Sequence, residues 1–134
     1  MIDFTGNEVA YDLYSGIGTI ATLLSKKAKK VIGIEYSKEA VTDGIANLKL
    51  NNIDNVKLFN GDMANLLNFR FARRYGLPDV IFTDPPRSGM APAVINSIVE
   101  IYPKDIIYIS CNPATQARDI QDLSQHYKVA GIGY

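Results

Sequence analysis

The chain contains 134 residues, and its 14 basic and 14 acidic side chains leave no net charge. This length holds one domain and leaves no room for a second. The 47% hydrophobic content excludes a disordered chain. The absence of net charge is unlike the basic excess of a stand-alone nucleic-acid binder. A single cysteine excludes an internal disulfide. The sequence shows no signal-peptide pattern and no apolar stretch long enough to cross a membrane, so it predicts a soluble, cytoplasmic domain with no membrane contact.

Short apolar runs rich in β-branched residues alternate with segments of helical periodicity along the whole chain. The apolar runs predict strands at 9–14, 31–35, 56–60, 80–84, 106–110 and 129–134. The segments between them predict helices at 19–28, 38–50, 63–75, 91–101 and 113–125. Ser37 and Asp62 are suited to cap the second and third helices. This alternation is typical of an α/β fold with a doubly wound, mostly parallel sheet and helices on both faces.

The sixth predicted strand ends at Tyr134, the last residue of the chain. Because the edge of a sheet is normally paired or covered, we expect a sheet that is truncated at its C-terminal strands. The sequence therefore predicts that residues 1–134 are one domain, a fragment of a longer protein.

Residues 12–18, Asp-Leu-Tyr-Ser-Gly-Ile-Gly, join the first strand to the first helix. Ligands of an open α/β sheet bind outside the carboxyl ends of its strands, and Gly16 and Gly18 let a ligand approach the backbone there. Ala21 stands where the dinucleotide fingerprint has its third glycine, so the loop alone is a weak signal. Glu35 ends the second strand about twenty residues later, where an acid accepts hydrogen bonds from ribose hydroxyls. Together these residues favour a nucleoside-containing cofactor.

Polar residues also follow the third and fourth strands. Asp62 has two interpretations of equal weight, a helix cap or a contact to the edge of an adenine ring. Residues 84–89, Asp-Pro-Pro-Arg-Ser-Gly, form a stiff turn that fixes Asp84 at the sheet edge, because neither proline donates an N–H group. Arg87 is placed to bind a phosphate or a nearby acid in bidentate fashion. We interpret this turn as a device that orients a substrate.

Cys111 lies between the fifth predicted strand and a helix that begins at Pro113. Asn112 is a good N-cap, and proline suits the first helical position. Since helix N-termini favour thiolate over thiol, Cys111 is a candidate nucleophile, and its alternative role is a buried packing residue. His126, the single histidine, lies in a polar connection and is interpreted as a surface residue. We predict no metal site.

These motifs resemble those of a known family. Residues 12–18 resemble the S-adenosylmethionine loop of Rossmann-like methyltransferases. Residues 84–89, followed by Ile-Ile-Tyr-Ile-Ser-Cys-Asn-Pro-Ala-Thr at 106–115, resemble the paired signature of the RNA uracil-5-methyltransferases, which make 5-methyluridine in tRNA and 23S ribosomal RNA. The continuation 116–119 fits the same family. The likeness covers nearly the whole chain and implies a Rossmann-like fold, S-adenosylmethionine as the cofactor and an RNA substrate, with ribosomal RNA favoured.

The resemblance also implies roles for single residues. Tyr14, Glu35 and Asp84 match positions that contact the cofactor, whereas Thr19 stands where some members place a cofactor-contacting asparagine. Cys111 matches the nucleophile, which attacks C6 of uracil so that C5 becomes reactive toward the methyl group. In the family a glutamate beyond the cysteine helix then removes the C5 proton, and further domains bind the RNA. We expect both to be absent from this chain, and the chain alone to be inactive.

Two other functions remain open. Amino-group methyltransferases of adenine or guanine also use an Asp/Asn-Pro-Pro turn, but normally with an aromatic residue after it and without a required cysteine. Arg87 and Cys111 argue against that class, and their neighbours fit the uracil family better than RNA cytosine-5 methylation. A non-catalytic adenosyl-binding module is the second alternative.

Overall fold

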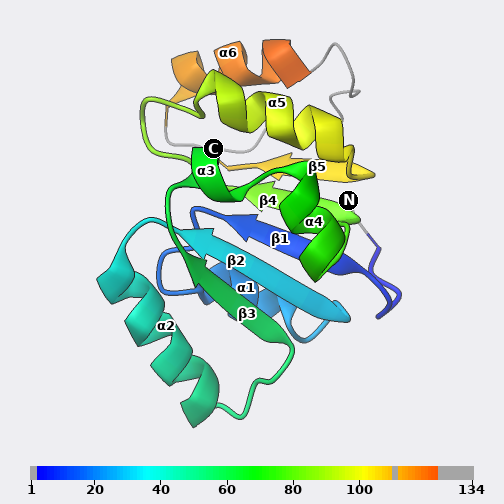
Figure 1. The fold of residues 1–134 in the computed structure, drawn as a ribbon, viewed down its shortest axis with the longest axis vertical. Helices are drawn as coiled ribbons and strands as arrows, with labels where there is room; N and C mark the ends of the chain where they lie inside the picture. Colours follow the sequence, from blue (N-terminus) through cyan, green and yellow to red (C-terminus); the bar gives the residue numbers. More distant parts are fainter. Residues whose placement is uncertain (1–2, 110–111, 124–134) are drawn as a thin grey trace.

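The computed structural model describes residues 3–109 and 112–123 (Figure 1). Within these ranges the elements are β1 (Val9–Leu13), α1 (Thr19–Leu24), β2 (Lys30–Glu35), α2 (Lys38–Leu50), β3 (Val56–Asn60), α3 (Met63–Leu66), α4 (Phe69–Tyr75), β4 (Val80–Thr83), α5 (Pro92–Ile101), β5 (Asp105–Tyr108) and α6 (Pro113–Leu123). All pairs among these five strands are parallel, which confirms the predicted α/β fold. The predicted strand at 129–134 lies outside the described residues.

The order of the strands, β3-β2-β1-β4-β5, reverses beside β1. From β1 the chain moves outward through β2 to β3 and then crosses to β4 on the other side of β1. In open α/β sheets such a switch point marks the crevice where ligands bind. Leu13 pairs with Ile34 and with Thr83, so the carboxyl ends of β1, β2 and β4 lie in register. The segments that follow these three strands therefore meet at one edge of the sheet.

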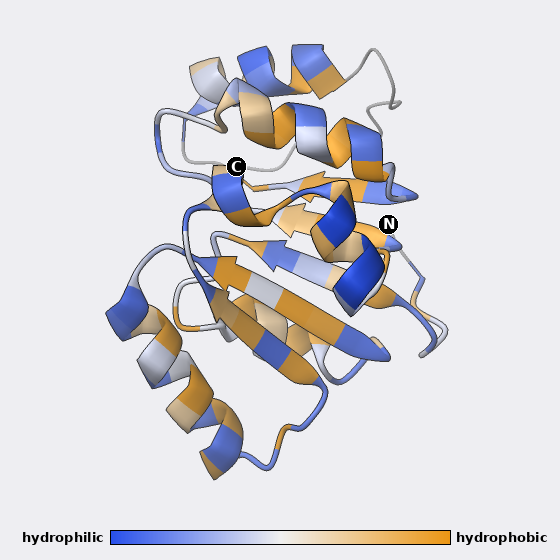
Figure 2. Ribbon diagram, viewed as in Figure 1, coloured by the Kyte–Doolittle hydropathy of each residue, from blue (hydrophilic) through white to orange (hydrophobic). Residues whose placement is uncertain are grey.

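Hydrophobic cores cover both faces of the sheet. One core joins the strands to residues of α3, α4, α5 and α6, and the other joins them to α1 and α2. Figure 1 shows α3 and α4 in front of the sheet and α1 behind it. The central strands β1 and β2 are buried over most of their length. Figure 2 shows that most of β2 is hydrophobic. A sheet buried on both faces gives a rigid support for the edge that carries the polar residues.

The third predicted helix, at 63–75, is wrong as a single helix. Leu67 is extended, with φ −79° and ψ 108°, and ends α3. Asn68 is also extended, and its Oδ1 accepts a hydrogen bond of 2.8 Å from the Phe71 amide, so it caps a new helix, α4. Asparagine side chains compete with the helical backbone for such amides, and hydrophobic periodicity alone does not reveal this break.

Smaller differences concern the ends of elements. The first helix ends at Leu24 rather than residue 28, because residues 25–28 form tight turns. The first strand ends at Leu13, since Tyr14 has a left-handed φ of 60°. Ser37 caps α2 as predicted, and its hydroxyl accepts from the Ala40 amide at 3.2 Å. Among the helices in the described part of the chain, not one has the length and apolar character needed to cross a membrane.

Candidate functional site

The turn after β1 approaches the end of β2 closely. Gly16 and Gly18 have φ values of 58° and 87°, a left-handed conformation that favours glycine. A side chain built on Gly16 would meet no atom within 4 Å, so this backbone is open to a ligand. The Gly16 amide donates a hydrogen bond of 2.9 Å to Oε1 of Glu35. The structure therefore brings together the glycine turn and the acid that the sequence analysis selected.

Glu35 also contacts the start of the following helix. Its Oε2 accepts a hydrogen bond of 2.8 Å from the Ser37 amide. The two oxygens thus bridge the glycine turn and the segment that precedes α2, which fixes the carboxylate at the sheet edge. A carboxylate oxygen accepts more than one hydrogen bond, so Glu35 retains capacity for hydroxyl donors of a ligand.

Asp12, which the sequence analysis did not select, lies in β1 beneath the glycine turn. It is only 1% exposed, and its Oδ2 has no hydrogen-bond partner among the described residues; nor has the buried Oγ of Ser15. The pKa of Asp12 is raised to about 7, mainly by burial and in smaller part by the charges of Asp84 and Glu35, although a hydrogen bond from the Ala21 amide lowers it. The signal in the sequence was an acid inside the apolar strand Val-Ala-Tyr-Asp-Leu.

Asp62 follows β3 and caps α3, because its Oδ1 accepts from the Ala64 amide at 3.3 Å. The cap interpretation of this residue is therefore confirmed. Asp62 also lines a cavity of about 550 Å³. A contact of its carboxylate with the edge of an adenine ring is therefore compatible with the cap and stays a prediction.

This cavity extends from Tyr36 and Asp62 past Tyr14 to the 86–92 segment and α6. Its volume lies in the range of pockets that hold small molecules and cofactors. Tyr14 is half-buried in its wall, and burial together with the charges of Asp119 and Asp62 raises the pKa of its hydroxyl to about 12. The tyrosine therefore stays neutral and can serve as a hydrogen-bond donor.

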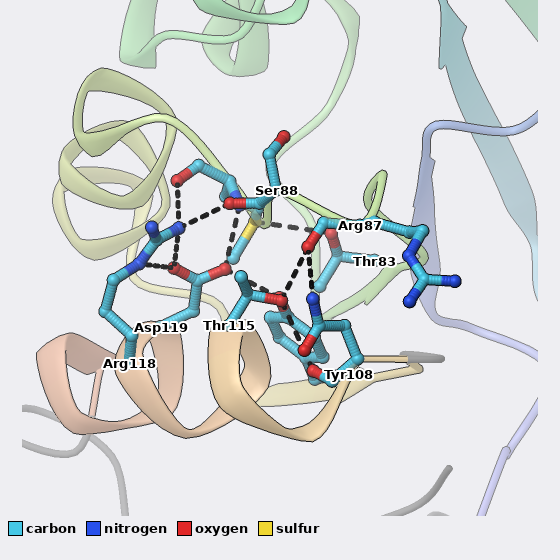
Figure 3. A network of polar contacts seen from close by, with 9 residues as sticks. Thr83, Arg87, Ser88, Tyr108, Thr115, Arg118 and Asp119 are labelled. Carbon is cyan, nitrogen blue, oxygen red and sulfur yellow. Dashed lines mark hydrogen bonds and ion pairs between the residues drawn. The ribbon is translucent and has the colours of Figure 1, made fainter.

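The Asp-Pro-Pro-Arg-Ser-Gly turn follows β4 at the same edge. Asp84 is exposed, and its amide donates to the Leu13 carbonyl at 3.3 Å, which ties the turn to the end of β1. The Arg87 carbonyl accepts from Nδ2 of Asn112 at 3.0 Å and from Oγ1 of Thr115 at 2.9 Å. Figure 3 shows that the Arg87 guanidinium points away from these contacts.

Of the two remaining predicted site residues, Thr19 and Cys111, the structure describes only Thr19. Thr19 is the exposed first residue of α1. Cys111 lies outside the described residues, as does His126. The predicted cap beside Cys111 is confirmed, because Oδ1 of Asn112 accepts from the Ala114 amide at 3.1 Å directly before the start of α6. Among the residues that the structure describes, no group of three or more His, Cys, Asp or Glu side chains is arranged to hold a metal ion.

The arrangement of charges favours one kind of ligand. The carboxylates of Asp12, Glu35 and Asp84 come from or directly follow β1, β2 and β4, and the field of the latter two acts on Asp12. A buried acid with an unpaired oxygen fits an ammonium group, and the Glu35 carboxylate fits hydroxyl donors. The edge therefore suits a ligand that carries both a cation and a sugar.

Comparison of the sequence with known proteins gives a family and relatives. A sequence model of the tRNA (uracil-5-)-methyltransferase family matches residues 3–133. A protein from Bacteroides thetaiotaomicron, described as an uncharacterized RNA methyltransferase, is 51% identical over 128 residues, which cover 96% of this chain and 28% of that protein. A second protein of the same description, from Porphyromonas gingivalis, is 51% identical over 116 residues, or 87% of this chain and 25% of its own.

Among solved structures, the chain is similar to the tRNA (uracil-54, C5)-methyltransferase of Pyrococcus abyssi in complex with S-adenosyl-L-homocysteine. The TM-score is 0.80 at 28% identity, and the match covers 95% of this chain and 30% of that one. A precorrin 8W decarboxylase from Methanobacterium thermoautotrophicum has a TM-score of 0.73 at 23% identity, a likeness of fold alone. The chain thus spans between a quarter and a third of the length of the two RNA methyltransferases and of the Pyrococcus enzyme.

Proposed function

The chain belongs to the tRNA (uracil-5-)-methyltransferase family, and on that premise we propose that it methylates C5 of uracil in RNA with S-adenosylmethionine as the methyl donor. We also propose that it is the catalytic domain of a longer protein, whose other segments bind the RNA, as the greater length of its relatives supports. The observation that carries the proposal is the convergence of the glycine turn, Glu35 and Asp12 at the switch point of the sheet.

The residues at this edge fit the cofactor by their chemistry. When bound, S-adenosylmethionine supplies an electrophilic methyl group on a sulfonium. We assign the unpaired Oδ2 of Asp12 to its ammonium group, and the Glu35 carboxylate to its ribose hydroxyls. The open backbone at Gly16 gives room for its close approach, and the left-handed φ of Gly18 shapes the same turn.

Further residues are assigned to the cofactor. Tyr14 and Asp62 line the cavity and are assigned to its adenosine end, and Asp84 to the rim beside β1. Thr19 remains a proposed contact from the family pattern. The family includes the Pyrococcus enzyme that was solved with S-adenosyl-L-homocysteine, which supports a related ligand here.

Cys111 is the proposed nucleophile. Addition of its thiolate to C6 of uracil forms an S–C6 bond and moves electron density to C5, which then takes the methyl group. A general base, which we place outside this chain, removes the C5 proton so that the electrons of that bond re-form the C5–C6 double bond and expel the thiolate. Arg87 is the proposed substrate-orienting residue, since its guanidinium points away from the contacts that hold its backbone.

The test compares the full-length protein with its Cys111→Ala variant. With 5-fluorouracil-substituted RNA, the wild type should form a covalent adduct that survives denaturation, and the variant should form none and methylate no uracil. Methylation that survives in the variant would instead favour an amino-group methyltransferase. Binding of S-adenosylhomocysteine without an adduct or methylation in the wild type would favour a non-catalytic adenosyl-binding module.

The choice of RNA is tested separately. We propose 23S ribosomal RNA as the target and expect 5-methyluridine to appear in it, rather than in tRNA, when the full-length protein is given unmodified total RNA. Methylation confined to tRNA would contradict this. The isolated chain should show no multiple turnover in the same assay.

A further inference from the structure

Asp119 is a charged residue in α6 that lies completely inside the protein, with 0% of its surface exposed. Its Oδ2 accepts hydrogen bonds from the Met90 amide at 2.8 Å and from the Tyr108 hydroxyl at 2.6 Å. Its Oδ1 accepts from Nε and Nη2 of Arg118 at 3.2 and 3.1 Å. A buried carboxylate is tolerated only when such partners replace water, and here both oxygens have them. Asp119 thus joins α6 to β5 and to the end of the segment that precedes α5.

The segment 86–90, which we call the Arg87 turn, is held on α6 through its backbone (Figure 3). Asn112 and Thr115 donate to the Arg87 carbonyl, and Nη2 of Arg118 donates to the Ser88 carbonyl at 2.8 Å. Within the turn, the Gly89 amide donates to the Pro86 carbonyl. Since proline has no amide hydrogen, the turn depends on donors and acceptors from α6 and the residue that precedes it.

Gly89 permits this close approach. Its φ is 81°, and a side chain built on it would lie 2.5 Å from Nη2 of Arg118 and 2.7 Å from Oδ2 of Asp119. Both distances are shorter than any normal contact. The glycine therefore explains why the turn and the Asp119 carboxylate can lie against each other.

We propose that Asp119 is a positioning residue, which fixes the Arg87 turn relative to α6 and thereby aligns Arg87 with the nucleophile of the reaction. The inference rests on the proposed function. The helix that carries Asp119 begins at Pro113, two residues after Cys111 in the sequence. One helix thus follows the proposed nucleophile and also holds the turn that carries the proposed substrate-orienting arginine. Asp119 itself contacts only protein groups in this network and acts through them.

The experiment uses the Asp119→Asn variant of the full-length protein. An amide has one acceptor oxygen instead of two, so either the Arg118 pair or the Met90 and Tyr108 pair loses its acceptor. We expect the single-turnover rate of uracil methylation, at saturating cofactor and RNA, to fall about tenfold or more, as for the loss of a buried charged hydrogen bond. Hydrogen exchange of the peptide that contains Met90 should become faster by a similar factor.

A matched control separates positioning from loss of stability. Ile101→Ala opens the core at the end of α5, away from the Arg87 turn, and should lower the melting temperature at least as much. The proposal predicts that this control keeps the wild-type single-turnover rate and the wild-type exchange at Met90. A wild-type rate in Asp119→Asn, or an equal loss of rate in both variants, would overturn it. If the wild type methylates no uracil, the proposed function fails, and the exchange at Met90 still decides whether Asp119 holds the turn.

Discussion

The amide of Gly16 donates a hydrogen bond of 2.9 Å to Oε1 of Glu35, across 19 residues of sequence. This bond joins the turn after β1 to the end of β2, at the point where the strand order reverses. The second oxygen of Glu35 holds the Ser37 amide, so one carboxylate organises both loops. The same side chain is the one we assign to the ribose hydroxyls, and its substitution therefore tests a structural and a binding role together.

Glu35→Gln should weaken the binding of S-adenosylhomocysteine about tenfold or more, because hydrogen bonds to a charged acceptor are stronger than those to an amide. The glutamine also keeps only one acceptor oxygen for the two backbone amides. Isothermal titration calorimetry of the full-length protein measures the change. Glu39→Gln, at an exposed position in the first turn of α2, is the matched control and should leave the affinity unchanged. Equal affinity in the two variants would contradict the assignment.

Asp12 predicts a pH dependence of stability. Its pKa in the folded chain is about 7, above the ordinary value of 3.8, so between these values the folded chain holds a proton that the unfolded chain has lost. The free energy of unfolding should therefore fall as pH rises through this window, by up to about 1.4 kcal/mol for each unit of raised pKa. Asp12→Asn removes the titrating group, and urea unfolding at pH 5 and pH 8 should show a smaller difference than in the wild type. An unchanged difference would show that Asp12 does not titrate there.

The same group predicts how ligand binding depends on pH. An ammonium group beside Oδ2 favours the ionised carboxylate, so the affinity for S-adenosylhomocysteine should decrease as pH falls below about 7, where Asp12 takes up a proton. The Asp12→Asn variant should bind more weakly at pH 8 and lose this dependence. Calorimetry at pH 6 and pH 8 measures both effects, and a wild-type affinity in the variant would argue against the ammonium contact.

Much of the fold could be predicted from the sequence, because its strands are short apolar runs and its helices have regular spacing. The parallel pairing of the strands follows from the alternation of strands and helices along the chain. The cap at Ser37 follows from local side-chain chemistry. The break between α3 and α4 could not be predicted from periodicity, since it depends on Asn68 binding the Phe71 amide instead of continuing the helix. Competition of this kind is decided by geometry over three residues rather than by hydrophobic pattern.

The site shows the same division. The glycine turn, Glu35, Asp62 and Asp84 could be selected because each ends or follows a strand, and parallel strands end at one edge. The unpaired oxygen of Asp12 and the bonds of Asp119 could not, because burial and partners are set by packing between distant segments. The sequence around Arg118 and Asp119 fits the family pattern, but it does not indicate which groups these two side chains contact.

The break at Asn68 gives a prediction about stability. Asn68→Ala removes the acceptor for the Phe71 amide and should lower the free energy of unfolding by about 1 kcal/mol, the usual cost of a lost N-cap. Urea unfolding measures this. Asn65→Ala is the matched control, because the side-chain Nδ2 of Asn65 donates only a long, exposed hydrogen bond of 3.4 Å to Oδ2 of Asp62. Its substitution should therefore lower the free energy of unfolding by less. A larger loss for Asn65→Ala would argue against the cap at Asn68.

The close approach of Gly89 to Asp119 predicts that one added methyl group, in Gly89→Ala, lowers the free energy of unfolding unusually strongly. Gly89→Ala places a side chain in a left-handed conformation and also drives it to 2.7 Å from Oδ2 of Asp119, so strain and overpacking act together. Gly6→Ala is the matched control, since Gly6 also has a positive φ, of 92°, but its added side chain would meet nothing within 4 Å. We expect Gly89→Ala to lower the free energy of unfolding by about 1–3 kcal/mol more than Gly6→Ala does, as measured by urea denaturation. Equal losses would mean that only backbone strain matters at position 89 and that the Arg87 turn does not pack tightly on Asp119.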